Sequence, residues 1–193
     1  LRSESGYLPD PETIEPLITD RTRILLVNSP SNPLGTVVDQ DRLAALCELA
    51  ERHDLWLLSD ECYDQIVFEG EVAPSPAPIA PDRVVSVHSF SKTYAMTGLR
   101  VAYVSGPLAV IETLTKMQEA LIACVNGPAQ KAALAALEGP QDFVAEMRQT
   151  YQRRRDRAVA AAEGLGLPHH RPHGAFYLWL PLCDRIGDPM EFC

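Results

Sequence analysis

The stretch "VVSVHSFSKTYAMTGLR", residues 84–100, places a lysine among hydroxyl side chains. An apolar, β-branched run leads into Lys92, which follows Ser89 and Ser91, and Arg100 comes eight residues later. A lysine held at the end of a strand, partly away from water, can present a neutral amine for Schiff-base chemistry. Hydroxyl donors and a guanidinium are suited to binding a phosphate. The alternative is a Ser/Thr-rich loop with a solvated lysine, and this stretch alone favours neither.

A second polar group follows the apolar run "WLLSD". Asp60 ends that run, and Tyr63 comes three residues later in "ECYDQ". A carboxylate at the end of so apolar a strand is partly desolvated, which is costly unless a cation or a hydrogen-bond donor meets it. Asp60 can meet this need by pairing with a structural arginine or by holding a proton on a ligand. Tyr63 adds a phenol that can reach the same place.

A third polar stretch, "NSPSNPLG", follows the apolar run at residues 24–28. Asn32 precedes Pro33 and Gly35 closes the segment, a combination that ordinarily forms a turn. Turn formation explains the backbone without a role for the Asn32 side chain, so this motif alone favours a structural interpretation.

The elements that would position these residues are four apolar runs predicted to be strands, at residues 24–28, 56–60, 84–89 and 101–105. They are continuous rather than alternating, as expected where helices cover both faces of a parallel sheet. Residues 39–54 carry a helical apolar face, with Asp39 as the N-terminal cap. A strand, a helix and a strand within about 35 residues form a βαβ unit, so the predicted fold class is α/β with a mostly parallel sheet.

The second half of the chain is predicted to be mainly helical, at residues 111–124, 129–137 and 141–164. The basic cluster "RRRDR" at residues 153–157 falls in the last of these and is predicted to be a solvated helix face. "GAFYLWLPL", residues 174–182, alternates enough to be a strand of a second, smaller domain.

Composition excludes several functional classes. The 193 residues are 46% hydrophobic and carry a formal net charge of -9, which argues against a nucleic-acid surface with its basic face. No apolar run approaches the roughly 18 residues that a membrane span needs. The five cysteines are scattered without a C-x-x-C pair, which indicates reduced thiols in a cytoplasmic protein.

In an open α/β sheet, ligands bind beyond the carboxyl ends of the strands. Successive strands here deliver an amide, a carboxylate, a phenol, an amine and a set of phosphate-binding groups to that edge. Pyridoxal phosphate (PLP) needs an amine for its aldehyde, a partner for its pyridine nitrogen and an anchor for its phosphate. The combination therefore predicts a PLP site, which none of the three motifs predicts alone.

The three motifs resemble, in residue identity, order and spacing, those of the class I/II aminotransferases, which belong to the fold-type I superfamily of PLP-dependent enzymes. The resemblance runs over nearly the whole chain. It implies the large domain of that fold, with helices on both faces of the sheet, followed by the start of a smaller α+β domain. The implied division is residues 1–138 for the large domain, 139–166 for a connecting helix and 167–193 for the small domain.

The resemblance also implies roles. Lys92 would bind the cofactor aldehyde and then carry a proton between the substrate α-carbon and the cofactor, while Asp60 would hold the pyridine nitrogen protonated. Tyr63 and Asn32 would hydrogen-bond the cofactor's 3′ oxygen, and Asn32 is also a candidate substrate-binding residue. The implied catalytic residues are Lys92, Asp60 and Tyr63, and the implied cofactor-binding residues are Asn32, Asp60, Tyr63, Ser89, Ser91, Lys92 and Arg100.

The activity implied is transfer of an amino group between an amino acid and a 2-oxo acid by a ping-pong mechanism, in a homodimer. A β-lyase, a decarboxylase or a synthase on the same scaffold stays open, because the shared cofactor chemistry does not separate them. A PLP-binding regulator without turnover also stays open. In the family, further phosphate contacts, a partner-subunit tyrosine and a carboxylate-binding arginine come from segments outside residues 1–193, so we expect this chain alone to have little or no activity.

Overall fold

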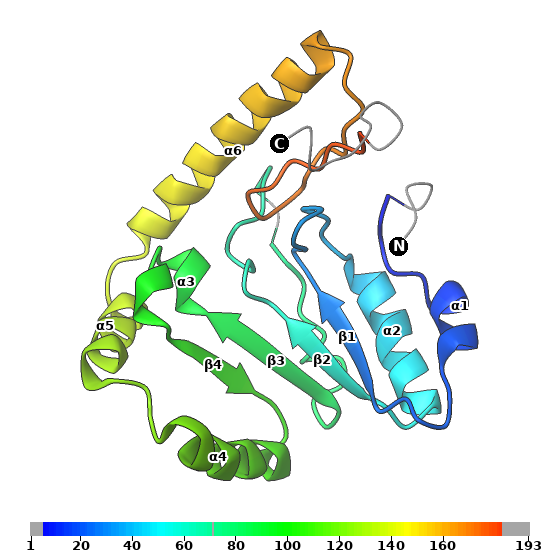
Figure 1. The fold of residues 1–193 in the computed structure, drawn as a ribbon, viewed down its shortest axis with the longest axis vertical. Helices are drawn as coiled ribbons and strands as arrows, with labels where there is room; N and C mark the ends of the chain where they lie inside the picture. Colours follow the sequence, from blue (N-terminus) through cyan, green and yellow to red (C-terminus); the bar gives the residue numbers. More distant parts are fainter. Residues whose placement is uncertain (1–5, 71, 183–193) are drawn as a thin grey trace.

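The computed structural model describes residues 6–70 and 72–182. Its centre is a four-stranded sheet in the spatial order β1-β2-β3-β4 (Figure 1). The strands are β1 (Ile24–Asn28), β2 (Trp56–Asp60), β3 (Val84–Ser89) and β4 (Ala102–Ser105). Strands β1, β2 and β3 are parallel, and β4 is antiparallel to β3. The predicted mostly parallel α/β sheet is confirmed, with the fourth strand starting one residue later than expected.

Helix α2 (Gln40–Arg52) lies between β1 and β2 in the chain, as predicted. The Asp39 carboxylate caps it by accepting a hydrogen bond from the Arg42 amide at 2.8 Å. Its apolar face packs on Val27, Leu57 and Val84 of the sheet, and the helix residues buried there are Leu43, Leu46, Cys47, Leu49 and Ala50.

The opposite face of the sheet is exposed over β1 and the start of β2 in the part of the chain that the structure describes. Ile24, Leu26 and Trp56 alternate with the buried strand residues and are 55%, 61% and 41% exposed. The strand order and helix α2 establish the α/β fold class. The continuous apolar runs predicted a second layer of helices, and no such layer covers these three side chains among the described residues.

The predicted helices in the second half are confirmed, with bounds shifted by a few residues. They are α4 (Leu108–Ile122), α5 (Gly127–Glu138) and α6 (Asp142–Gly164). Shorter helical segments are α1 (Pro11–Ile14), η2 (Glu15–Leu17), α3 (Phe90–Thr93) and η3 (Thr97–Leu99). Within the described ranges, no helix has the length and hydropathy that a membrane span requires.

The prediction of a strand at residues 174–182 is wrong for the part that the structure describes. Only isolated bridges occur there, between Val67 and Gly174 and between His170 and Trp179. The Ala175 amide donates to the Ile66 carbonyl at 2.8 Å, and the Gly174 amide donates to the Gly35 carbonyl at 2.9 Å. Successive amides thus bond to two different loops, so they do not form one continuous ladder. Residue 183 and those after it lie outside the described residues.

The prediction for "RRRDR" is wrong at one position. Arg155 is buried, whereas Arg153, Arg154 and Arg157 are exposed as expected. The Arg155 guanidinium forms an ion pair with Glu69, donates to the Pro172 carbonyl at 3.0 Å and lies 4.7 Å from the centre of the Phe68 ring. A buried guanidinium is tolerated when carboxylate and carbonyl oxygens satisfy its donors. Glu69 and Pro172 are far from α6 in sequence, whereas Asp156, whose carboxylate accepts a hydrogen bond from Arg155 Nε at 2.9 Å, is the next residue of the same helix.

Candidate functional site

Strands β1 and β2 end level with each other, and β3 continues two residues further in the same direction. Asn28 pairs with Asp60 across β1 and β2, and Asp60 pairs with Val87 across β2 and β3. The loops that follow these strands therefore leave from one edge of the sheet, where the arrowheads of β1, β2 and β3 point in Figure 1. This is the edge where an open α/β sheet binds ligands.

Lys92 lies in the single turn of α3, directly beyond β3. The Ser89 hydroxyl caps this turn by accepting a hydrogen bond from the Ser91 amide at 3.1 Å. The Lys92 side chain is half-buried, and its Nζ lies 5.8 Å from the centre of the Tyr63 ring and 5.5 Å from that of Phe176. Within the described part of the chain no carboxylate forms an ion pair with it. The amine therefore points into an aromatic enclosure, which disfavours the solvated-lysine alternative.

Asp60 is half-buried at the end of β2. One of its carboxylate oxygens accepts a hydrogen bond from the Cys62 amide at 3.2 Å, and its carbonyl accepts one from the Asn28 side chain at 3.2 Å. No arginine pairs with it among the residues described, so the structural ion pair considered from sequence is not formed. Burial raises the pKa of the neighbouring Cys62 thiol to about 12, and hydrogen bonding to Asp60 adds to that rise.

Tyr63 is buried beside Lys92, as the motif predicted. Its hydroxyl lies 2.6 Å from the hydroxyl of Tyr177, and its ring meets Phe176 edge-on at 5.4 Å. Burial raises the pKa of Tyr63 well above its ordinary value, and the hydrogen bond with Tyr177 raises it further. The phenol is therefore a neutral hydrogen-bond donor at physiological pH.

Sequence reasoning missed Phe176 and Tyr177 as site residues. They belong to "GAFYLWLPL", which was interpreted only as a strand. The available signal was the pair of adjacent aromatic residues directly after Gly174 and Ala175, since a strand of a solvated small domain does not need both.

Asn32 lies in a tight loop after β1, as the turn signals predicted. Its amide donates to the Asn28 side chain at 2.7 Å, and the Gly35 amide donates to the Ser31 carbonyl at 2.9 Å. Asn32 itself is exposed at the edge of the sheet. The structure thus explains the backbone of this motif, and the role of the Asn32 amide toward a cofactor stays a prediction.

The phosphate-binding set is not brought together by direct contacts. Arg100 is exposed, and its guanidinium donates to the Thr97 carbonyl at 3.0 Å. Ser91 is buried, whereas the Ser89 hydroxyl is half-buried at the start of α3. Among the residues that the structure describes, no hydrogen bond joins Arg100 to either serine. Their shared role toward a phosphate stays a prediction.

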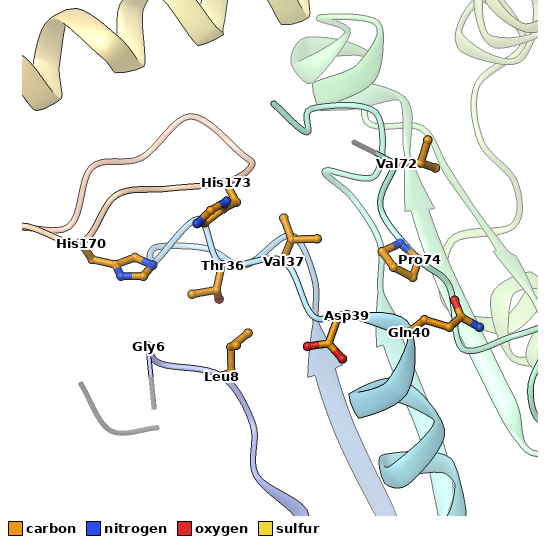
Figure 2. Close-up of a pocket in the computed structure, with 10 residues that line it drawn as sticks. All are labelled: Gly6, Leu8, Thr36, Val37, Asp39, Gln40, Val72, Pro74, His170 and His173. Atoms are coloured by element: carbon orange, nitrogen blue, oxygen red, sulfur yellow. The ribbon is translucent and has the colours of Figure 1, made fainter. Parts of the chain in front are cut away.

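A large cavity lies elsewhere. It has a volume of about 600 Å³ and is lined by residues that include Thr36, Asp39, His170 and His173 (Figure 2). None of the seven residues predicted from the sequence lines it. It therefore gives no support to chemistry at Lys92, which the aromatic enclosure and the strand ends define instead.

The fold and the site together define an α/β protein with a sequestered lysine at the carboxyl edge of a mixed sheet. The sequence model of the family described as "Aminotransferase class I and II" matches residues 1–192, and the chain belongs to this family. An aspartate/prephenate aminotransferase of Thermus thermophilus is 42% identical over 191 residues, covering 97% of this chain and 49% of the relative. An arginine–pyruvate transaminase of Pseudomonas aeruginosa is 40% identical over 186 residues, covering 94% of this chain and 47% of the relative.

Solved structures of aminotransferases have the same fold as this chain. The aspartate aminotransferase of Thermus thermophilus with maleate superimposes with a TM-score of 0.94 at 38% identity, covering 98% of this chain and 50% of that one. An aromatic aminotransferase of Pyrococcus horikoshii superimposes with a TM-score of 0.89 at 34% identity, covering 93% and 49%. The chain spans about half the length of the relatives it matches.

This family depends on PLP, and the residues present fit that cofactor. Lys92 lies beside two aromatic rings and forms no ion pair with a carboxylate of the described ranges, and Asp60 at the next strand end pairs with no arginine in them. Tyr63 supplies a neutral phenol beside them. An amine, a carboxylate and a phenol at one sheet edge are the donor set that the aldehyde, pyridine nitrogen and 3′ oxygen of PLP require.

Proposed function

We propose that this chain provides the cofactor-binding part of a PLP-dependent aminotransferase that moves an amino group between an amino acid and a 2-oxo acid. The observation that carries the proposal is the position of the Lys92 amine, 5.8 Å from the Tyr63 ring and 5.5 Å from the Phe176 ring, at the edge where Asp60 also ends its strand. The printed names of the relatives, which are aminotransferases and a transaminase, support the same reaction class.

When bound, PLP supplies an aldehyde carbon for an amine and a ring that accepts electrons. Lys92 would hold the cofactor through its amine, and the same amine would take up and return the proton of the substrate α-carbon. Asp60, which pairs with no arginine among the described residues, would bind the pyridine nitrogen and hold its proton. Tyr63 and Asn32 donate to the 3′ oxygen, and Asn32 also borders the substrate.

The phosphate is assigned to the start of α3. Ser89 directly follows β3 and supplies a hydroxyl at the start of α3, and Arg100 adds the charge that a phosphate requires. Ser91 is buried and is the weaker member of this set. Because the Arg100 guanidinium bonds only to the Thr97 carbonyl among the described residues, it can turn toward the phosphate at the loss of one exposed hydrogen bond.

We infer that the natural protein acts as a homodimer in the cytoplasm. Dimerisation is typical of the family, and the described cysteines Cys47, Cys62 and Cys124 are free thiols, as expected in a reducing compartment. The substrates are an amino acid and a 2-oxo acid. The relatives named above differ in the substrates in their names, so the side chain of the preferred amino acid is not inferred from them.

The test is reduction of the PLP-loaded protein with borohydride, followed by peptide mapping. The expected result is a visible absorbance band before reduction and a pyridoxyl label on Lys92, both lost in Lys92→Ala. Lys131→Ala is the matched control, because Lys131 is an exposed lysine on α5 and its loss should leave the label in place. A label on another lysine, or none on the natural protein, would overturn the proposal. Release of 2-oxo acid and ammonia without a 2-oxo acid acceptor would replace transamination by lyase chemistry.

A further inference from the structure

Tyr63 and Tyr177 form a pair whose hydroxyl oxygens are 2.6 Å apart although the residues are 114 positions apart in the chain. The rings meet edge-on at 5.9 Å, and Phe176 packs against both. Tyr63 is buried and Tyr177 is half-buried. A contact this short between two hydroxyl groups requires that one of them donates and the other accepts.

The backbone fixes the geometry of this pair. The Ile66 amide donates to the Tyr63 carbonyl at 2.8 Å, and the Ala175 amide donates to the Ile66 carbonyl at 2.8 Å. The first bond lies within the loop after β2, and the second joins that loop to the segment that carries Tyr177. In Figure 1 that segment, drawn in orange, lies beyond the carboxyl ends of the strands. The hydroxyls therefore meet because of backbone hydrogen bonds as well as ring packing.

We propose that Tyr177 is a positioning residue: it donates its hydroxyl proton to Tyr63, so that Tyr63 directs its own proton to the 3′ oxygen of the cofactor. The inference rests on the proposed function, because it needs a cofactor at Lys92. The inference extends the proposed function because it assigns a role to Tyr177, which lies in the segment that follows α6.

The number of protons available decides which of the two phenols donates and which accepts. Each neutral phenol has one proton to donate. If Tyr63 donates to Tyr177, it has none left for the cofactor, whose ionised 3′ oxygen only accepts. If Tyr177 donates, both protons are used and the two bonds polarise each other. The charged acceptor at the end of the chain therefore selects the order Tyr177, Tyr63, cofactor.

The surroundings keep the Tyr63 phenol neutral. The titratable groups that face Tyr63 are Tyr177, Cys62, Asp60 and Lys92. Burial, the Tyr177 hydrogen bond and the negative charge of Asp60 all raise the pKa of Tyr63, so its proton stays in place at physiological pH. Lys92 lies over the ring rather than at the hydroxyl, at 5.8 Å from the ring centre.

The test measures the pH midpoint of the visible absorbance of the PLP bound to Lys92, in the longest natural form of the protein. A hydrogen bond to the 3′ oxygen disperses its charge, which weakens its pull on the proton of the nitrogen that joins Lys92 to the cofactor. Weakening that bond should raise the midpoint. We expect a rise of about half a pH unit in Tyr177→Phe and a larger one in Tyr63→Phe, since one neutral hydrogen bond is the difference.

A double-mutant cycle separates positioning from packing. Adding Tyr177→Phe to Tyr63→Phe should change nothing further, because the bond through which Tyr177 acts is already gone. Tyr151→Phe is the control: its ring stacks on Phe176 at 5.3 Å, but its hydroxyl forms no hydrogen bond with the residues described, so the midpoint should stay. Tyr177→His, which keeps a ring and an N–H donor, should restore most of the wild-type midpoint and serves if Tyr177→Phe folds poorly.

Two results would overturn the inference. The first is that Tyr177→Phe changes neither the pH midpoint of the absorbance nor the affinity for PLP. The second is that Tyr177→Phe shifts this midpoint by the same amount in the wild type and in the Tyr63→Phe variant. Either would leave the proposed function standing, because the wild-type protein would still carry PLP on Lys92. Absence of PLP on Lys92 in the wild type would instead remove the proposed function, and the inference with it.

Discussion

Gly35 and Gly174 lie against each other, with the Gly174 amide donating to the Gly35 carbonyl at 2.9 Å. The amide of His173 donates to the same carbonyl at 2.8 Å. A Cβ added to Gly35 would meet the carbonyl oxygen of Gly174 at 2.8 Å and would also collide with the ring of Pro172. This contact joins the loop that carries Asn32 to the segment that carries Phe176 and Tyr177.

Gly35→Ala should lower the free energy of unfolding by about 3 kcal/mol, measured by urea denaturation. Gly35 has a φ of +67°, a conformation that costs alanine about 1 kcal/mol, and the collision with backbone atoms adds the rest. Gly166→Ala is the matched control. Gly166 has a φ of +62°, but its added Cβ meets nothing within 4 Å, so only about 1 kcal/mol should be lost there. If the two variants lose the same free energy of unfolding, the contact between the added Cβ at position 35 and Gly174 does not destabilise the fold.

The strands and the position of Lys92 were predictable because the signals are local. Continuous runs such as "ILLVN" and "VVSVHS" became β1 and β3, and an acidic residue at position 39 caps α2 as expected. Lys92 and Asp60 reached the same sheet edge because β2 and β3 are parallel, so the loops that follow them leave from the same edge.

What sequence reasoning missed depends on partners far along the chain. Arg155 is buried because Glu69 and Pro172 meet it, and neither is near α6 in sequence. Tyr177 approaches Tyr63 because Ala175 bonds to Ile66, which also interrupts the strand predicted there. A charge run and an alternating apolar run have the same local pattern whether or not such a partner exists, so the pattern alone predicted a solvated face and a strand.

The ion pair between Arg155 and Glu69 should contribute a pH-dependent part of the stability. Hydrogen bonding and the positive charge of Arg155 hold the pKa of Glu69 below its ordinary value near 4.5. A carboxyl whose pKa is lower in the folded state stabilises the fold at pH values above the unfolded pKa. That contribution is lost as the pH falls from about 4.5 through the lowered value.

Arg155→Met should therefore lower the free energy of unfolding at pH 7 by about 2 kcal/mol, because a buried guanidinium and its bonds are removed while Glu69 is left half-exposed. The loss should shrink as the pH falls from about 4.5 through the lowered pKa of Glu69, because the carboxylate that pairs with Arg155 becomes protonated over that range. Arg154→Met, an exposed neighbour on the same helix, should cost less than about 0.5 kcal/mol at any pH. Urea denaturation at pH 7 and pH 3.5 measures both variants, and a loss that does not depend on pH would contradict the assignment.

The rate at which the Cys62 thiol reacts should depend on the negative charge of Asp60. Burial and Asp60 raise the pKa of Cys62 to about 12, so its thiol stays protonated at pH 8 and should react slowly with a disulfide reagent. Cys124 is exposed and should react first. Asp60→Asn removes a negative charge that raises the Cys62 pKa, so Cys62 should then react faster, by several-fold. Peptide mapping after timed labelling assigns each thiol, and rapid labelling of Cys62 in the wild type would contradict this account of its surroundings.

Replacing Asp60 should weaken PLP binding more than replacing its acidic neighbour Asp64. Asp60→Asn keeps the size of the side chain but removes the charge that would hold a proton on the pyridine nitrogen. A hydrogen bond between charged groups contributes about 1.5–3 kcal/mol, so the dissociation constant for PLP should rise about 10- to 100-fold.

Asp64→Asn makes the same change of charge and shape four residues further along the chain. Asp64 accepts hydrogen bonds from the Thr93 hydroxyl at 3.4 Å and the Gln65 amide at 2.8 Å, so its carboxylate is already occupied by neutral donors. Its substitution should change PLP affinity less than about threefold, since only neutral hydrogen bonds are weakened. Affinities come from absorbance titration of the cofactor-free protein. Equal effects at the two positions would mean that PLP responds to the total negative charge near Lys92, and the assignment of Asp60 to the pyridine nitrogen would then fail.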